Sequence, residues 1–435
     1  MTDLSLARHR KPLSLLNAAL VDPVTGYAGP GAVRLRGGLI EDVVHRASPA
    51  PSEGEIVDCG GHTLAPGIID ARVFVGEPGA RHRESHRSAG EAAAAGGVTT
   101  LIQQPDTAPP LDDPALVQFT LARAREASPV HVHAMAALTR GLRGEEMTEQ
   151  RFLLDAGAVA LTDADHPVSD AKMFLACLRY ATSTGALVVH HPQEPALTAG
   201  SCATSGEFAS RLGLPSVPAI AERIMLARDL ALVEASSARY HADQLSTEAA
   251  LGPLLRAKEA GLDVTAGVSI HHLTLNEYDI ADYRSFFKLA PPLRTDEDRQ
   301  AMIEALGTGL LDCVVSSHLP WDEEAKRLPF EQAATGAAGL ETLLPAALRL
   351  VHGGHITLPA LFERLSTAPA RRFGLNGGRL ATGAPADLVL FDPNAPLVID
   401  RWTLKSKSKN TPFDRSRMQG RVLGTWVAGI RVFGD

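Results

Sequence analysis

The stretch GIIDARVFVGEPG, residues 67–79, predicts a short buried strand that runs into a Gly/Pro turn. Seven similar apolar runs follow, and amphipathic segments such as 170–185, 221–236 and 296–309 separate most of them. Alternating strands and helices predict a parallel sheet, and eight such units over roughly 300 residues predict a closed (β/α)8 TIM-like barrel in an α/β protein. The eight expected strands are residues 67–74, 98–104, 130–137, 158–163, 186–191, 238–243, 263–270 and 312–317.

The two ends of the chain differ from this middle. Short β-like runs split by turns fill residues 12–65, and similar runs fill residues 375–435. The alternation in GRVLGTWVAGIRVF, residues 420–433, suits a pair of strands. We therefore expect a small β-sandwich domain built from both termini, residues 1–65 and 371–435, around a barrel of residues 66–370.

Composition excludes several classes of protein. The 435 residues are 45% hydrophobic and carry a net charge of −8, so the chain can build a core and lacks the basic footprint of a nucleic-acid binder. No apolar run reaches the roughly 18 residues of a membrane span. Scattered cysteines without a CxxC pair indicate buried thiols in a cytoplasmic protein. These cysteines are Cys59, Cys177, Cys202 and Cys313.

Polar residues stand near the ends of the expected strands. In TIM barrels the site lies at the carboxyl ends of the strands and is built from several of them. The sequence therefore predicts a site at that end of the barrel. The residues are Asp70, Asp106, His133, Asp163, His190, His191, His241, His271, His272 and His318.

Three short motifs are expected to be structural. HVH at 131–133 predicts hydrogen-bonded histidines at the barrel mouth, because a His-x-His pair alone is too short to specify a metal. RHRESHR at 81–87 predicts a solvated helix start, and KSKSK at 405–409 predicts plain surface.

Longer motifs are similar to those of the dihydroorotase family of the amidohydrolase superfamily. They are APGIID, EPG at 77–79, AAAAGGVTTLIQQPDT, GLRGEEM, RLGLPSVPAIAE, HHLTLNE, PPLRTDEDR, GLLDCVV, GLET and KNTPF, and they span nearly the whole chain. The resemblance implies hydrolysis of a cyclic amide with zinc at the barrel mouth. Zinc lowers the pKa of its bound water and polarises a carbonyl group.

The metal positions depart from this family pattern. The family's Asp-x-His-x-His motif on the first strand places its two histidines at Arg72 and Phe74 here. The sixth-strand ligand position falls on Gln244, and the general-base Asp position falls on Ser317. The base position therefore holds a neutral side chain, which cannot do the work of a carboxylate.

Two metal positions are kept by the resemblance, the bridging carboxylate at Asp163 and the fifth-strand ligand at His191. Two ligands are fewer than the three protein ligands typical of catalytic zinc. Arg72 adds a fixed positive charge where the cation would lie. We therefore hypothesise that Arg72 fills this place and pairs with Asp163, because a buried carboxylate without a partner is costly.

Three substrate-binding positions are also replaced. The resemblance implies an arginine where Gly76 stands, an asparagine where Asp106 stands and an asparagine where Ala290 stands. All nine of these positions are therefore expected to be vestigial, with no catalytic residue, no metal ligand and no cofactor.

The resemblance implies a dihydroorotase-like protein of pyrimidine biosynthesis that is catalytically inactive. The sequence therefore favours a protein that is not an enzyme. Its implied partner is the catalytic chain of aspartate transcarbamoylase, in a homodimer or hetero-oligomer, with no nucleic acid and no membrane. The alternative is an active dihydroorotase with zinc held by Asp163, His191, His241 and either His133 or His318. A third hypothesis is an amidohydrolase acting on another ring, such as a hydantoin or allantoin.

Overall fold

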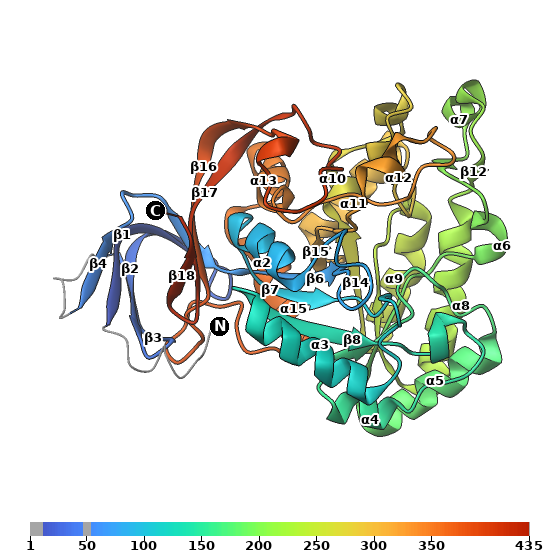
Figure 1. Cartoon of the computed structure of the whole chain (residues 1–435), viewed down its shortest axis with the longest axis horizontal. Helices are drawn as coiled ribbons and strands as arrows, with labels where there is room; N and C mark the ends of the chain where they lie inside the picture. The colour runs from blue at the N-terminus through green and yellow to red at the C-terminus, as the bar shows by residue number, and fades with distance from the viewer. Residues whose placement is uncertain (1–11, 47–53, 435) are drawn as a thin grey trace.

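A computed structural model describes residues 12–46 and 54–434, and it contains the predicted barrel (Figure 1). All eight expected strands are present and pair in the parallel order β15-β14-β13-β10-β9-β8-β7-β6. Their bounds are β6 Ile68–Val73, β7 Val98–Gln103, β8 His131–Ala136, β9 Ala160–Leu161, β10 Leu187–His190, β13 Arg239–Ala242, β14 Val264–Ser269 and β15 Cys313–Val315.

The barrel closes between its first and last strands. Val73 forms a parallel bridge with His318, and the Phe74 N–H donates to the His318 carbonyl at 2.8 Å. The Ser316 N–H donates to the Asp70 carboxylate at 3.2 Å. These bonds join β6 to the residues after β15, so the closing seam lies at the carboxyl end of the barrel.

Helices surround the barrel and begin and end where local sequence dictates. The Asp170 side chain caps α5 by accepting from the Lys172 N–H at 2.7 Å, and α5 ends at Gly185, whose φ of +73° suits glycine. The α-helices are α2 His86–Ala95, α3 Pro114–Ala127, α4 Gln150–Asp155, α5 Ala171–Thr184, α6 Pro195–Thr198, α7 Glu207–Leu212, α8 Ile220–Ser236, α9 Glu248–Glu259, α10 Ile270–Thr274, α11 Asp296–Thr308, α12 Glu323–Arg327, α13 Leu343–His352, α14 Leu358–Phe362 and α15 Ala368–Phe373.

Short elements complete the connections between strands and helices. The 3-10 turns are η1 Arg140–Leu142, η2 Glu277–Ile280, η3 Ser285–Phe287 and η5 Arg401–Thr403; η4 Glu363–Thr367 is a π-helix. β11 Ala203–Thr204 and β12 Ser216–Val217 form a small pair of their own.

Strands from both termini form the predicted second domain (Figure 1). The sheet runs in the order β18-β17-β16-β5-β1-β2-β3, β4 pairs with β1, and most of its pairs are antiparallel. Its strands are β1 Leu13–Asp22, β2 Tyr27–Arg36, β3 Leu39–His45, β4 Glu55–Asp58, β5 Thr63–Pro66, β16 Leu388–Val398, β17 Arg417–Val427 and β18 Ile430–Phe433. The division of the chain at residues 65/66 and 370/371 stays a prediction.

The small sheet has its own core and is tied to the barrel. Leu20, Leu64 and Trp426 are fully buried in a cluster separate from the barrel core. The Thr425 hydroxyl of β17 donates to the Ala94 carbonyl of α2 at 2.7 Å. This buried hydrogen bond is one of the contacts between the two domains.

Two expectations about short motifs are wrong. His131 is the first residue of β8 and its Nε2 lies 3.2 Å from Asp387, so HVH starts at the end of the barrel opposite the mouth. In RHRESHR, Glu84 and His86 are fully buried and Ser85 caps α2, so only part of this motif is solvated.

The expected burial of the cysteines is confirmed, since all four are buried and none forms a disulfide. Among the described residues, no helix is both long and apolar enough to cross a membrane.

Candidate functional site at the barrel mouth

Arg72 is the centre of the barrel mouth. It lies on β6, and its side chain is 7% exposed. One terminal nitrogen forms an ion pair with Asp243, after β13, and the other with Asp165, after β9. Burial opposes the charge, but the two carboxylates hold the pKa of Arg72 above its ordinary value, and Arg72 in turn holds the pKa of Asp165 below its own. The Arg72 guanidinium is thus held by ion pairs to carboxylates that follow two different strands.

Gln244 and Ser317 complete the surroundings of Arg72. With its amide oriented to suit its neighbours, the Gln244 oxygen accepts from Arg72 Nε at 2.6 Å and its nitrogen donates to Ser317 Oγ at 2.5 Å. Gln244 and Ser317, the expected ligand and base positions, are therefore hydrogen-bonded to each other, and Gln244 also accepts from the arginine. This network satisfies polar groups in a buried place.

The hypothesis that Arg72 pairs with Asp163 is wrong. The Asp163 carboxylate accepts from the backbone N–H groups of Leu138 and Thr139, both at 2.9 Å, and from the Thr139 hydroxyl. It therefore holds the loop after β8 and is directed away from the arginine. The pairing carboxylates are Asp165 and Asp243; Asp165 lies two residues beyond the strand expected at 158–163, and Asp243 is the last residue of the strand expected at 238–243.

The second replaced position on the first strand holds an aromatic stack. Phe74 is buried, and the Arg83 guanidinium lies 4.1 Å from the centre of its ring and 3.5 Å from that of Trp321. Arg83 Nε donates to the Pro320 carbonyl at 2.9 Å. A cation packed between two aromatic faces is favourable, so Phe74 acts in packing here.

The three replaced substrate positions are also placed by the structure. A side chain at Gly76 would put its Cβ 2.1 Å from the Ala80 carbonyl oxygen, so no arginine fits there without a backbone shift. Asp106 and Ala290 line the same small cavity as Arg72. Burial, reinforced by Asp165, raises the pKa of Asp106 to about 6.

The cavity at the mouth is small. Its volume is about 20 Å³, which is room for about one water molecule, whereas small-molecule sites occupy about 300–1,000 Å³. The cavity beside Arg72 and its partners is therefore too small for a small-molecule ligand.

The backbone of the mouth keeps an uncommon geometry. Ala164, Gln244 and Ser317 follow β9, β13 and β15, and each has a φ of +52°, a left-handed conformation that side chains other than glycine seldom adopt. Such strain concentrates at functional sites. Three strand ends at the mouth therefore share the backbone strain that is typical of functional sites.

The ligand set of the alternative hypothesis does not come together. His241 Nδ1 lies 2.8 Å from the Thr265 hydroxyl, and His318 Nδ1 accepts from the Gly339 N–H at 3.2 Å. His191 is buried near Asp165. Across residues 12–46 and 54–434, no three or more His, Cys, Asp or Glu side chains are arranged to hold a metal ion.

We expect the buried His191 to make stability depend on pH. Burial lowers its pKa to about 4; Asp165 opposes this shift and Arg72 reinforces it. An unfolded histidine has a pKa of about 6.5, so between about pH 6.5 and 4 the unfolded state binds the extra proton and stability falls as the pH falls. His191→Asn should remove about 3 kcal/mol of this pH dependence, measured by urea unfolding across that range. The exposed His45→Asn is the control, and an unchanged slope in His191→Asn would contradict the assignment.

Comparisons with known structures define the class of the fold. L-hydantoinase (dihydropyrimidinase) from Arthrobacter aurescens superposes with a TM-score of 0.88 at 24% identity, covering 98% of this chain and 96% of that one. Dihydropyrimidinase from Brevibacillus agri NCHU1002 gives a TM-score of 0.82 at 21% identity, covering 97% and 95%. The fold is that of these barrel proteins, each with a small sheet domain.

Sequence comparisons define the family. The dihydroorotase-like family matches residues 61–250. A protein named dihydroorotase from Anaplasma phagocytophilum (strain HZ) is 38% identical over 97% of this chain and 95% of its own length. Another from Syntrophus aciditrophicus (strain SB) is 35% identical over 96% and 98%. The chain belongs to the dihydroorotase family.

The expectation that no cofactor is involved is contradicted by these relatives, because dihydroorotases and hydantoinases are metal-dependent amidohydrolases. The donors at the family's metal position in this chain nevertheless do not fit a divalent cation. Arg72 brings a positive charge, and its carboxylate partners are engaged with it. The chemistry of the family and the residues of this chain disagree at one place, the barrel mouth.

Proposed function

We propose that this member of the dihydroorotase family acts in pyrimidine biosynthesis as a structural partner of the aspartate transcarbamoylase catalytic chain and does not hydrolyse dihydroorotate at its barrel mouth. The observation that supports this most is the ion pairing of Arg72 with Asp165 and Asp243. The arrangement fills the site and leaves about 20 Å³. A family scaffold whose site side chains have changed is expected where shape rather than chemistry is maintained.

A second candidate is an active dihydroorotase, and the names of the relatives favour it. Proteins 38% and 35% identical over nearly the whole chain are named dihydroorotase. This candidate requires Arg72 to leave the barrel mouth, because its positive charge lies where the metal ion would bind. It also requires the side chains around it to rearrange, because neither Gln244 nor Ser317 can act as the general base. The location in the cytoplasm, the homodimer or hetero-oligomer and the absence of a nucleic-acid partner remain part of the proposal.

Turnover of dihydroorotate decides between the two candidates. We expect the purified protein with added Zn²⁺ to be about 10³-fold or more slower than the Anaplasma phagocytophilum dihydroorotase run beside it, since removal of a single stabilising group already costs about 10²–10³-fold. The assay is repeated with aspartate transcarbamoylase present, and complex formation is followed by sedimentation.

The outcomes separate the two parts of the proposal. Turnover comparable to the reference enzyme, alone or in the complex, would establish the active candidate. No turnover together with a stable complex supports the structural role. If no complex forms with aspartate transcarbamoylase, this partner is ruled out, whereas the proposal of an inactive barrel mouth stands.

A further inference from the structure

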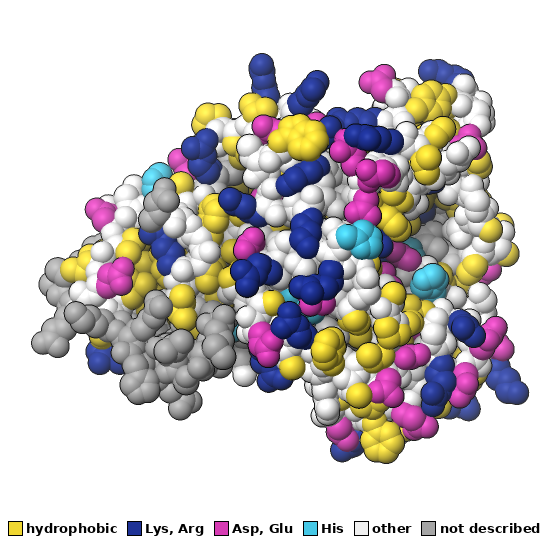
Figure 2. All heavy atoms as spheres, viewed as in Figure 1, with side chains coloured by type: hydrophobic (Ala, Val, Ile, Leu, Met, Phe, Trp, Pro, Cys, Tyr) yellow, Lys and Arg dark blue, Asp and Glu magenta, His cyan; other side chains and the backbone are white. Residues whose placement is uncertain are grey.

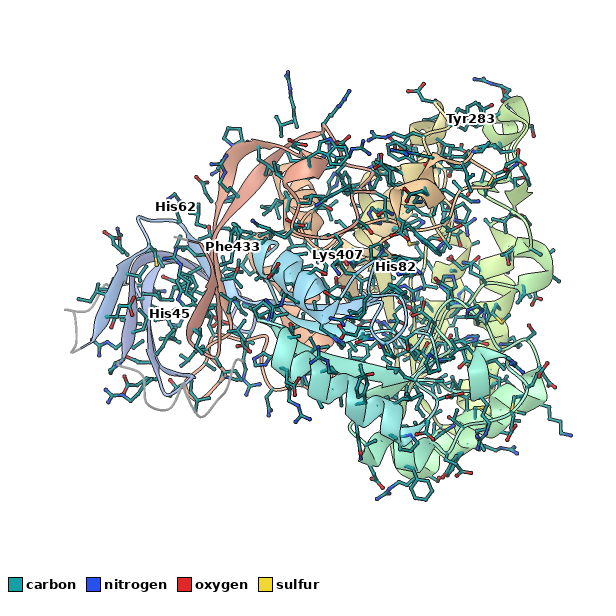
Figure 3. All side chains as sticks on the ribbon, in the orientation of Figure 1. His45, His62, His82, Tyr283, Lys407 and Phe433 are labelled. Atoms are coloured by element: carbon teal, nitrogen blue, oxygen red, sulfur yellow. The ribbon has the colours of Figure 1, made fainter. Side chains whose placement is uncertain are left out.

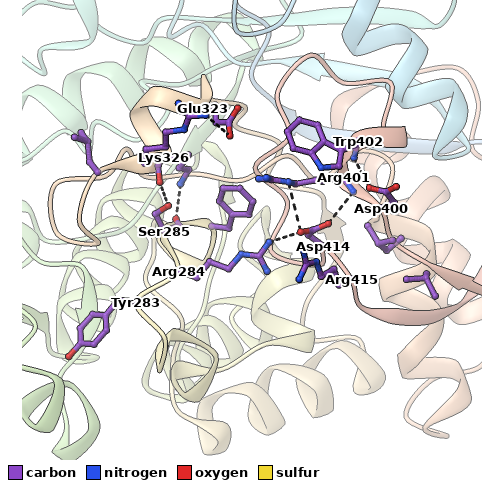
Figure 4. A pocket seen from close by; sticks show the side chains of 15 residues that line it. Tyr283, Arg284, Ser285, Glu323, Lys326, Asp400, Arg401, Trp402, Asp414 and Arg415 are labelled. Atoms are coloured by element: carbon purple, nitrogen blue, oxygen red, sulfur yellow. Dashed lines mark hydrogen bonds and ion pairs between the residues drawn. The ribbon is translucent and has the colours of Figure 1, made fainter.

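A larger cavity lies away from the barrel mouth (Figure 4). Its volume is about 950 Å³, and four segments line it, namely residues 283–286, 323–328, 398–402 and 414–415. The first two belong to the barrel and surround η3 and α12, and the last two belong to the connection between β16 and β17 that contains η5. We call this cavity the η5 groove.

The η5 groove carries a positive balance in an acidic protein. Five of its side chains are basic and three are acidic, whereas the whole chain has a net charge of −8. Two of the three acidic groups form ion pairs, since Asp414 accepts from Arg284 at 2.8 Å and Glu323 pairs with Arg327 at 3.1 Å, and the third, Asp400, accepts from the Trp402 N–H at 3.0 Å. The charged side chains are Arg284, Lys326, Arg327, Arg401 and Arg415, with Glu323, Asp400 and Asp414.

Two of these cations have no carboxylate partner within residues 12–46 and 54–434. Lys326 is buried, and its Nζ donates only to the carbonyl oxygens of Ser285 at 3.0 Å and Ala334 at 2.6 Å. The exposed Arg415 side chain makes no ion pair there, and its φ is +67°. Backbone strain in a residue other than glycine is found most often at functional sites.

Exposed apolar side chains form the rim. The exposed fractions are 60% for Trp402, 62% for Val398, 47% for Leu328 and 45% for Tyr283. Arg401 stacks on Trp402 at 4.3 Å from its ring centre. Tryptophan, tyrosine and arginine are the residues that dominate protein–protein binding energies, and here they surround one groove from two sides (Figure 4).

The basic surface continues beyond the groove. Residues 405–409 follow η5 and lie along residues 81–87, where Lys407 Nζ donates to the Arg81 carbonyl at 2.7 Å and Ser408 Oγ to the Arg83 carbonyl at 3.1 Å. Figure 2 shows basic side chains gathered over the middle of this face, and Figure 3 places Lys407 and His82 there. Two motifs distant in sequence therefore form one basic strip.

We propose that the η5 groove docks an acidic segment of a partner protein, whose carboxylates pair with the exposed Arg415 and whose apolar side chains contact Trp402. The cations are spread along the groove, and apolar groups stand on both walls, so the arrangement suits an extended segment rather than a single small anion. The proposal goes beyond the proposed function, because it depends neither on aspartate transcarbamoylase nor on the barrel mouth.

The test uses the full chain and a short fluorescein-labelled peptide of repeated Glu-Glu-Leu units, with a Lys-Lys-Leu peptide as the charge control. Binding is measured by fluorescence anisotropy. Trp402→Ala and Arg415→Gly are each expected to weaken binding of the acidic peptide about tenfold or more. Arg415→Gly removes the charge and keeps the left-handed backbone favourable.

Matched controls lie elsewhere on the surface. Phe152→Ala removes another aromatic side chain with an exposed fraction of 60%, on α4, and Arg46→Gly removes another exposed arginine with a φ of +66°. Neither should alter binding. The proposal is overturned if the acidic peptide does not bind, if the lysine peptide binds equally well, if the groove variants bind like the controls, or if inorganic phosphate alone displaces the peptide fully.

Discussion

Replacing Arg72 by methionine is expected to lower the free energy of unfolding by about 3–5 kcal/mol, the cost of removing one partner from a buried ion pair. Asp165 and Asp243 would then face each other at the barrel mouth without a cation. The large apolar replacement keeps most of the volume, so the loss reports on charge more than on packing. Urea unfolding at neutral pH measures it.

The pH dependence of the same variant gives a second readout. Without Arg72, the pKa of the two carboxyls in the folded state should rise above the unfolded value, so the destabilisation is largest at neutral pH and shrinks as the pH falls and they take up protons. Arg36→Met is the matched control, because Arg36 pairs with Glu41 at 2.6 Å on the surface, with side chains 62% and 38% exposed. Such a pair contributes about 0–1 kcal/mol. A loss for Arg72→Met no larger than that of the control would contradict the locked network.

Glu222→Ala is expected to destabilise the fold by a similar amount, about 3–5 kcal/mol. The fully buried Glu222 carboxylate accepts from the Ser246 N–H at 3.0 Å, the Thr247 N–H at 2.9 Å and Gln193 Nε2 at 2.7 Å, and it lies 3.9 Å from the buried Arg294. The substitution leaves these donors and the arginine without their acceptor. Urea unfolding again measures the loss.

The control for Glu222→Ala is Glu207→Ala on α7, whose side chain is 87% exposed and 3.7 Å from Arg211. It should change stability by about 0.5 kcal/mol or less. Glu222→Gln should lie between the two, because the amide keeps one acceptor oxygen. Equal stability of Glu222→Ala and Glu207→Ala would show that the carboxylate does not hold the segment after β13.

The strands of this protein could be predicted because their signals are local. Each barrel strand is a short apolar run between turn residues, and the parallel arrangement follows from their alternation with helices. The short strand β9, Ala160–Leu161, shows the limit, because the run at 158–163 is longer than the part that pairs. The chain turns directly after that run, at Ala164, and no local sequence pattern predicts the left-handed backbone of this residue.

The interactions of the site could be predicted only in part. The sequence shows which family positions have changed, and the structure places Arg72, Gln244 and Ser317 in one network. The partner carboxylates were missed because Asp165 lies beyond the strand expected at 158–163 and Asp243 ends the strand expected at 238–243, and no local pattern shows which of these side chains meets Arg72. Which of Asp163 and Asp165 meets Arg72 depends on the turn between them, where Asp163 is captured by the loop after β8.

By itself, the sequence determined the membership in the dihydroorotase family and the order of strands and helices, and it predicted other residues at the metal-binding and base positions. These properties follow from local sequence patterns and from the identity of single residues. Only the tertiary structure decided that Arg72 pairs with Asp165 and Asp243, that the mouth is filled, and that residues 81–87 and 405–409 form one basic strip. Each of these depends on side chains that are far apart in sequence and meet only when the barrel closes, because pairing of buried charges is set by distance and orientation in space.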